Sequence, residues 1–234
     1  MNNSADTLPI VSSDQPVTII GGAEVRPEDL SVALKCAPKV VAADGGANGL
    51  AALGVEPVAV IGDLDSLTEA ARARFADRLH LIEEQETVDF DKALQHTAAP
   101  LVVALGVTGG RLDHQLAALN VLARHPHRAC AILGGGSVIC LCPPRIEIDL
   151  APGADLSLFP LAEVRIRSEG LDWPTDHLIF RPDGRVGTSN RASGRAVLRA
   201  DRPGMLLILP DSAAAPLFTA LLAPGAARWP ARAG

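Results

Sequence analysis

The sequence predicts two domains: a Rossmann-like parallel α/β/α domain, followed by a small all-β domain of the sandwich or barrel type. From residue 17 to about 133, short apolar runs alternate with helix-like segments, as in a parallel sheet covered on both faces. After Pro143-Pro144, helix-like segments give way to short strands punctuated by Gly and Pro. The 234 residues, of which 48% are hydrophobic, can form two cores. We therefore expect domains at 17–143 and 144–234.

The expected elements follow from apolar runs for strands and from helix-like stretches between them. The strands of the first domain are Val17–Ile20, Val40–Ala43, Val58–Ile61, Leu79–Ile82, Leu101–Leu105 and Ala129–Leu133. Its helices are Pro27–Cys36, Asn48–Leu53, Thr68–Phe75, Asp89–His96 and Asp113–Arg124. The strands of the second domain are Ile146–Leu150, Asp155–Phe159, Val164–Ser168, Arg195–Leu198 and Met205–Leu209.

Net charge, cysteine spacing and the absence of long apolar runs narrow the classes of function that fit the sequence. A net charge of −6 argues against general nucleic-acid binding, which needs a basic surface. The cysteines lack zinc-like spacing and are expected to be small buried residues of a cytoplasmic protein. The polar start, Met1 to Gln15, lacks the features of a signal peptide and is expected to be a loose lead-in. No apolar run approaches the roughly 20 residues of a membrane span.

The segment from Val60 to Ser66 carries the clearest functional signal. An apolar strand ends at Gly62, and Asp63 and Asp65 follow it two residues apart. Side chains two apart in an extended segment point the same way, so these carboxylates converge and repel each other. A hard divalent ion, held partly by substrate phosphates, is the usual solution.

Two further turns have the same character. In the first, Asp44 precedes two glycines that allow close backbone approach to a ligand, although an ordinary acidic turn fits equally. Asn48 then either caps a helix or contacts a ligand. In the second, a double glycine and a helix start at Gly109–His114 form an anion-friendly pocket, with Arg111 placed for phosphate. Asp113 caps the helix, orients Arg111, or both, and His114 alone suggests a structural residue.

Asp89 and Lys92 open another helix. Asp89 is either a helix cap or a further metal ligand or proton acceptor, and Lys92 is either solvated or neutralises phosphate. The chain lacks both the P-loop and the G-x-G-x-x-G pattern, so phosphates would be held by metal, Arg and Lys.

In the second domain, Trp173 stands beside Asp172 in a chain with only 3% aromatic residues. The ring either belongs to the core or binds a flat cationic heteroaromatic ligand. The triplet Thr188-Ser189-Asn190 offers hydroxyl and amide groups, although alone it indicates only a turn.

Together these motifs closely resemble the thiamine pyrophosphokinase (thiamine diphosphokinase) family, over most of the chain from Val17 and in the family's order. The matching segments are Ala43–Asn48, Gly62–Ser66, Asp89–Lys92, Gly109–His114, Gly170–Pro174 and Thr188–Asn190.

The resemblance implies transfer of a pyrophosphoryl group from ATP to the hydroxyl of thiamine, with release of AMP. It implies Mg²⁺ as cofactor, and a homodimer with thiamine bound between the β-domain of one subunit and the α/β domain of the other. The implied metal ligands are Asp44, Asp63, Asp65 and Asp89. Catalysis would involve Asp63, Asp65, Asp89, Lys92 and Arg111. Substrate contacts would come from Asp44, Asn48, Ser66, Gln85, Asp113, His114, Trp173, Ser189 and Asn190.

Three positions depart from the family pattern. Val88 stands where Thr is common, Gly187 replaces a hydroxyl residue, and Arg191 stands where a smaller or acidic residue is usual. Two alternatives to an active kinase therefore stay open: a catalytically silent thiamine or nucleotide sensor, and a metal-dependent nucleotide-sugar transferase that uses Asp63 and Asp65.

Overall fold

The structure, a computed structural model, describes residues 8–231. Within them the chain forms two compact units, which we call the N-terminal unit (residues 8–121) and the C-terminal unit (residues 122–231). The compact units divide earlier in the chain than the predicted domains, whose boundary at 143/144 stays a prediction. No helix of the described residues is long and apolar enough to cross a membrane.

The N-terminal unit contains a parallel sheet, as predicted. Every pair of adjacent strands in its order β7-β2-β3-β4-β5 is parallel. Because β7 returns to the far side of β2, the strand order reverses there, and ligands of such sheets bind at this switch point. The strands are β2 (Val17–Ile20), β3 (Lys39–Ala43), β4 (Ala59–Gly62), β5 (Leu79–Leu81) and β7 (Val102–Leu105).

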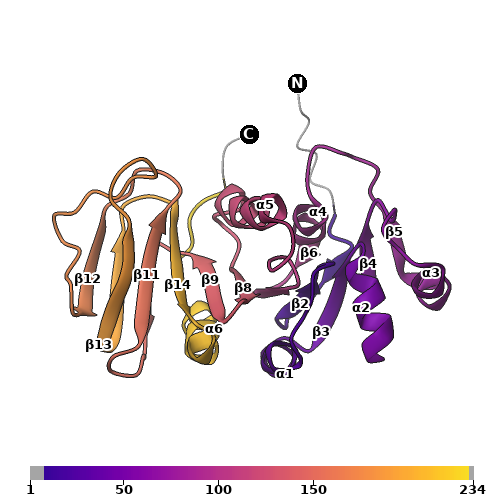
Figure 1. Cartoon of the computed structure of the whole chain (residues 1–234), viewed down its shortest axis with the longest axis horizontal. Coiled ribbons are helices and arrows are strands. Elements are labelled where there is room, and N and C mark those ends of the chain that lie inside the picture. The colour runs from indigo at the N-terminus through magenta and orange to yellow at the C-terminus, as the bar shows by residue number, and fades with distance from the viewer. Residues whose placement is uncertain (1–7, 232–234) are drawn as a thin grey trace. The chain divides into compact units, whose positions relative to one another are not determined.

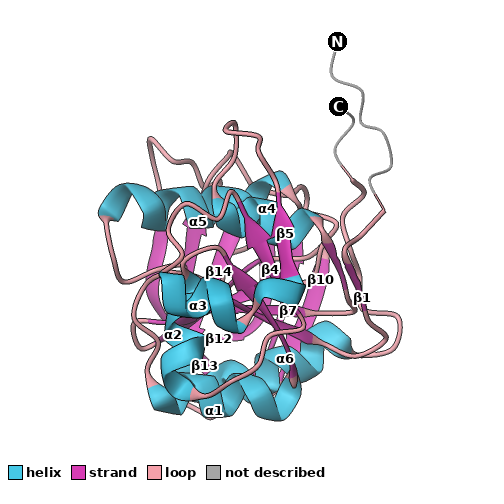
Figure 2. Cartoon of the chain, turned by 90° about the vertical axis from the view of Figure 1, so that its right-hand side faces the viewer, coloured by secondary structure: helices cyan, strands magenta, loops and turns pink. Residues whose placement is uncertain are grey.

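Helices cover both faces of this sheet, which explains why β2, β4 and β7 are buried along their whole length. Figures 1 and 2 show α4 on the opposite side of the strands from α1 and α2. Pro27 begins α1 where its missing N–H is not needed, and the left-handed Gly54 ends α2. The helices are α1 (Pro27–Cys36), α2 (Gly46–Leu53), α3 (Glu69–Arg74), α4 (Asp89–Gln95) and α5 (Leu112–Arg124), with a 3₁₀ turn at Ala76–Arg78.

The chain start is more ordered than expected. Residues 1–7 of the predicted lead-in lie outside the described residues, but β1 (Val11–Ser12) pairs in parallel with β6 (Thr97–Ala98). The prediction of a loose segment is therefore wrong for Val11 and Ser12, because backbone groups beyond the main sheet were available to pair with them.

The C-terminal unit is an antiparallel β-structure. Its longest strand, β13, pairs with β11 through its first residues and with β10 and β12 through its later ones. It thus takes part in two sheets, as strands of sandwiches and barrels do. The strands are β8 (Cys130–Gly134), β9 (Ser137–Leu141), β10 (Arg145–Ile148), β11 (Asp155–Pro160), β12 (Ile166–Leu171), β13 (Gly187–Ala200) and β14 (Met205–Pro210).

The β-rich character is confirmed, but the all-β prediction is wrong in one respect. A 3₁₀ turn at Asp211–Ala213 leads into helix α6 (Ala214–Leu222), which buries Leu217, Phe218 and Leu221. The alanine- and proline-rich composition of this end concealed the helical spacing of those three residues. The predicted strand Arg195–Leu198 is also too short, because polar residues from Gly187 onward extend β13.

Trp229 fastens the segment after α6 to the unit. Its indole Nε1 donates a hydrogen bond of 2.9 Å to the carbonyl oxygen of Cys142, a residue with no exposed surface. We expect Trp229→Phe to leave that carbonyl without its partner and to lower the free energy of unfolding by about 1–3 kcal/mol. Urea denaturation checks this. Trp173→Phe is the control, since Trp173 is 58% exposed and should change little; equal effects of both variants would contradict the prediction.

Candidate active site

Three carboxylates converge at one end of the parallel sheet. Asp44 follows β3, and Asp63 and Asp65 follow the adjacent strand β4. Each residue offers a carboxylate oxygen, and these oxygens lie within 4.8 Å of one another. Since hard divalent ions prefer oxygen ligands at such sites, the three side chains could hold one ion.

Asp44 shows that these residues fit a cation. Its side chain is 1% exposed, and its Oδ2 accepts a hydrogen bond of 3.3 Å from the backbone N–H of Ser66. Its Oδ1 is buried and has no hydrogen-bond partner among the described residues. A buried carboxylate oxygen without a partner is costly, and a bound cation would remove that cost. The donor set therefore fits Mg²⁺, a hard ion that takes carboxylate oxygens.

Close backbone approach is built into this end of the sheet. A Cβ at Gly62 would lie 2.7 Å from the Cβ of Asp44, so only glycine lets the two strand ends meet. Asp44 and Leu64 both have left-handed backbones, with φ of 40° and 64°. Strain of this kind concentrates at functional sites.

Asn48 and Ser66, two of the predicted substrate contacts, bond to one another and to neighbouring residues. Asn48 donates from Nδ2 to the carbonyl of Ser66 at 2.8 Å, and its Oδ1 accepts from the N–H of Thr68 at 2.9 Å. The hydroxyl of Ser66 donates to Asp65 at 3.0 Å. Asn48 and Ser66 thus hold the turn that carries the acidic groups, and their substrate contacts stay a prediction.

Lys92 supplies the positive charge. Its side chain is 2% exposed, and Nζ lies 2.9 Å from Oδ2 of Asp63 and 3.3 Å from Oδ1 of Asp89. The hydrogen bond from Lys92 lowers the pKa of Asp63. Burial alone would lower the pKa of Lys92, but its hydrogen bond to Asp63 and the charges of Asp89 and Asp63 together raise it. Lys92 is therefore a fixed cation, and the alternative of a solvated lysine is excluded. Gln85 donates to the same oxygen of Asp63 at 3.3 Å.

Asp89 occupies a different position from the other three acidic residues. It begins α4 after Val88, and it reaches the carboxylates through Lys92. Burial, followed by the negative charge of Asp44, raises the pKa of Asp89. The structure groups Asp44, Asp63 and Asp65, and the role of Asp89 as a fourth metal ligand stays a prediction.

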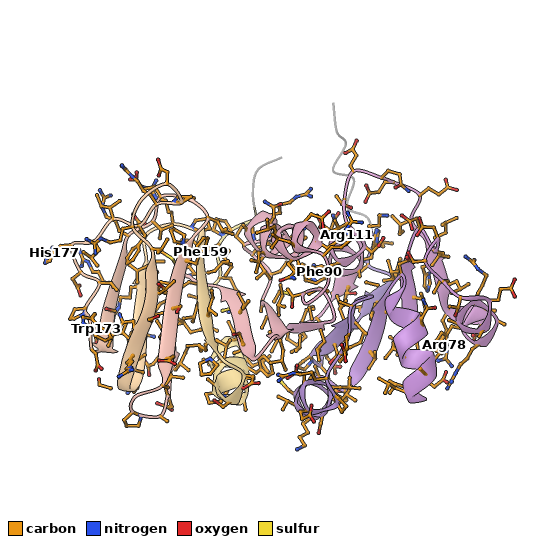
Figure 3. All side chains as sticks on the ribbon, viewed as in Figure 1. Arg78, Phe90, Arg111, Phe159, Trp173 and His177 are labelled. Carbon is orange, nitrogen blue, oxygen red and sulfur yellow. The ribbon has the colours of Figure 1, made fainter. Side chains whose placement is uncertain are left out.

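Arg111, labelled in Figure 3, lies just before α5, and it pairs with Asp113 in the first turn of that helix. The guanidinium donates to both carboxylate oxygens of Asp113, at 3.1 and 2.5 Å. Oδ1 of Asp113 also accepts from the backbone N–H of His114 at 3.0 Å, so Asp113 both orients Arg111 and holds the helix start. The Arg111 side chain is 73% exposed.

Most of these groups line one cavity of about 550 Å³, within the range of small-molecule sites, whereas Asp65 and Asp113 are not among its lining residues. The motif analysis missed part of its lining, although one signal was available. Gly21 and Gly22 directly follow β2, and Gly45 and Gly46 follow β3 after Asp44. The cavity is lined by Gly21, Gly22, Asp44, Asn48, Asp63, Ser66, Gln85, Thr87, Val88, Asp89, Phe90, Lys92, Gly106, Arg111 and His114, among others.

The C-terminal unit has a pocket of its own, of about 310 Å³, lined by Trp173, Phe180, Ser189 and Asn190 among others. Figure 3 shows Trp173 in the segment between β12 and β13, and its 58% exposure excludes a core role. Asn190 is buried and bonds both backbone groups of Trp173, at 3.1 and 2.7 Å. Ser189 has a left-handed φ of 65°. Asn190 therefore fixes the position of Trp173.

Each departure from the family pattern has a place in the structure. A Cβ at Gly187 would lie 2.9 Å from the ring of Phe180, so packing excludes a hydroxyl residue there. Val88 precedes α4 without a side-chain cap and lines the larger cavity. Arg191 lies 3.8 Å from Asp155.

The raised pKa of Asp89 predicts that its ionised carboxylate lowers the stability of the folded protein. Ionised Asp89 costs stability near pH 7, and this cost disappears as the pH falls below its ordinary pKa of 3.8. We expect Asp89→Asn, with a chelator present, to raise the urea midpoint at pH 7 and not at pH 3. Asp77→Asn is the control, because that side chain is 80% exposed. A lower midpoint for Asp89→Asn at pH 7 would contradict the expected repulsion.

Acidic groups and a buried cation at the switch point of a parallel sheet are typical of proteins that act on phosphates with a metal ion. Comparison with known proteins adds a more specific similarity. Residues 30–133 match the family model described as "Thiamin pyrophosphokinase, catalytic domain". This part of the chain is therefore similar to the catalytic domain of thiamin pyrophosphokinases.

Relatives in sequence and solved structures of similar fold include proteins of that name. Thiamine pyrophosphokinase 1 of Arabidopsis thaliana is 28% identical over 158 residues, and the match covers 58% of each chain. Thiamine pyrophosphokinase of Bacillus subtilis is 35% identical over 89 residues, 35% of this chain and 42% of that one. The structure of thiamin pyrophosphokinase from Candida albicans is similar in fold, with a TM-score of 0.72 at 18% identity, covering 90% of this chain and 98% of the other. The chain thus spans 58% of the length of the Arabidopsis relative.

Proposed function

We propose that this chain is a thiamine pyrophosphokinase, which transfers the pyrophosphoryl group of ATP to the hydroxyl of thiamine and releases AMP. The observation that carries the proposal is the cluster of Asp44, Asp63 and Asp65, with one buried carboxylate oxygen unpartnered and Lys92 beside it. The similarity to that catalytic domain points to the same reaction.

In this reaction the hydroxyl oxygen of thiamine forms a bond to the β-phosphorus of ATP. The bond from that phosphorus to the oxygen bridging the α- and β-phosphates breaks, and AMP leaves with the electron pair. The hydroxyl proton passes to a carboxylate or to water. Such transfers need positioning and charge neutralisation more than covalent chemistry.

The residues in and beside the cavity of the N-terminal unit suit these needs. Asp44, Asp63 and Asp65 would hold Mg²⁺, which neutralises phosphate charge when bound. Lys92 keeps its charge because it is buried between two carboxylates, and it fixes the direction of Asp63. Arg111 is exposed just before helix α5. There it can exchange its bond to Asp113 for bonds to phosphate oxygens.

The proposal assigns the second substrate to the pocket of the C-terminal unit. Trp173, Ser189 and Asn190 line it, and an exposed aromatic face suits the cationic ring of thiamine. On this proposal residues 17–143 bind ATP and Mg²⁺, residues 144–234 bind thiamine, and the enzyme is a cytoplasmic homodimer. The four cysteines, free among the described residues, support a reducing compartment.

Product analysis tests the proposal directly. The protein is mixed with ATP, Mg²⁺ and thiamine, and nucleotides and thiamine esters are separated and quantified. We expect AMP and thiamine diphosphate in equal amounts, because attack occurs at the β-phosphorus. ADP with thiamine monophosphate would overturn the mechanism. Nucleotide binding without turnover would indicate a sensor, and turnover of a sugar nucleotide without AMP would indicate a glycosyl transferase.

Asp65→Asn tests the metal assignment. The variant loses one charged oxygen ligand but no packing, because Asp65 is exposed. We expect turnover to fall at least about 100-fold, with an unchanged circular dichroism spectrum. Asp77→Asn, an exposed aspartate away from the cavity, should keep full activity. Turnover of Asp65→Asn near the wild-type rate would contradict the assignment of Asp65 as a metal ligand.

A further inference from the structure

The turn of residues 63–68, which we call the acidic turn, carries two of the three converging carboxylates. Its backbone is under strain at Leu64, a non-glycine residue with a left-handed φ of 64°. Leu64 is buried, with 6% of its surface exposed. A non-glycine residue in this conformation costs about 1–2 kcal/mol. The repulsion between Asp63 and Asp65 adds to that cost. The turn therefore needs contacts that hold it from outside.

Arg72 makes one such contact. It lies on α3 and donates from Nη2 to the carbonyl oxygen of Leu64 at 2.5 Å. Hydrogen bonds from a charged donor are among the stronger ones. Arg72 is not among the residues that line the cavity, so it reaches the site only through the acidic turn.

Asn48 makes the second contact, from α2. Its amide bonds the carbonyl of Ser66 and both the N–H and the hydroxyl of Thr68, at 2.8, 2.9 and 3.0 Å. Thr68 in turn caps α3, the helix that carries Arg72. The acidic turn is thus anchored at Leu64 from one helix and at Ser66 and Thr68 from another.

We propose that Arg72 is a positioning residue of the metal site, with Asn48 as the second anchor. Arg72 keeps Leu64 in its left-handed conformation, so that Asp63 and Asp65 face Asp44 before any ion or substrate arrives. The inference rests on the proposed function only in taking the bound ion to be a divalent metal. It does not depend on which substrate reacts.

The experiment measures Mn²⁺ binding to the full chain by electron paramagnetic resonance titration, without nucleotide or thiamine. We expect Arg72→Ala to weaken Mn²⁺ binding about 10–100-fold, as loss of an outer contact of a metal ligand typically does. Asn48→Ala should act in the same direction. Arg72→Lys keeps a charged donor and should recover part of the affinity.

Arg74→Ala is the matched control. Arg74 lies on the same helix, but it bonds Glu56 and the carbonyl of Ala51, and so leaves the acidic turn untouched. Its Mn²⁺ affinity should stay within about twofold of the wild type, the change expected when no contact of a metal ligand is lost.

A second measurement separates positioning from general stability. Thermal unfolding is followed with chelator and with saturating Mn²⁺, because a ligand stabilises only the folded state that binds it. A merely structural Arg72 would lower both midpoints equally, whereas the proposal expects a smaller Mn²⁺-induced shift in Arg72→Ala.

Two results would overturn the inference: Arg72→Ala binding Mn²⁺ like Arg74→Ala, or a wild type that binds no Mn²⁺. The outcome is independent of the proposed reaction. If Arg72→Ala binds Mn²⁺ more weakly and the wild type turns over no thiamine, the positioning role is supported. The assignment of thiamine as the substrate is then refuted.

Discussion

Repulsion between carboxylates is the constraint on which the N-terminal unit depends. Asp44, Asp63 and Asp65 have oxygens within 4.8 Å of one another, and Lys92, which is 2% exposed, offsets part of their charge. A buried lysine keeps its charge only when acidic groups surround it, and the acidic groups stay close only when a cation is near. The interaction is therefore mutual, and helix α4 must lie where it does to supply Lys92.

Glycines make the geometry possible. Gly62 lets the ends of β3 and β4 approach, and a Cβ at Gly46 would lie 2.0 Å from the carbonyl oxygen of Ile20. The start of α2 is therefore pressed against the end of β2. Because strand ends and helix starts meet here without intervening side chains, the backbone itself forms much of the wall that faces a ligand.

The pocket of the C-terminal unit is built by a different principle. Arg185 is its one charged lining residue among those described, and a buried amide holds an exposed ring in place through the bonds between Asn190 and Trp173. Phe180 fills the space beside Gly187, so the floor of the pocket is apolar. Such a pocket favours a flat ring over a phosphate. The two cavities therefore differ in chemical character.

The sequence by itself determined the five-stranded parallel sheet of the N-terminal unit, its helices and the position of the three carboxylates, but not the small pair β1 and β6. The sheet and the carboxylates follow from local patterns: apolar runs fix the strands, and acidic residues directly after parallel strands must meet at one edge. Tertiary structure decided the rest. Helix α6 and the pairing of β9 with β14 depend on contacts distant in sequence. The bonds of Asn48 and Arg72 to the acidic turn were invisible in the sequence, because a polar side chain carries no sign of which backbone group it will reach.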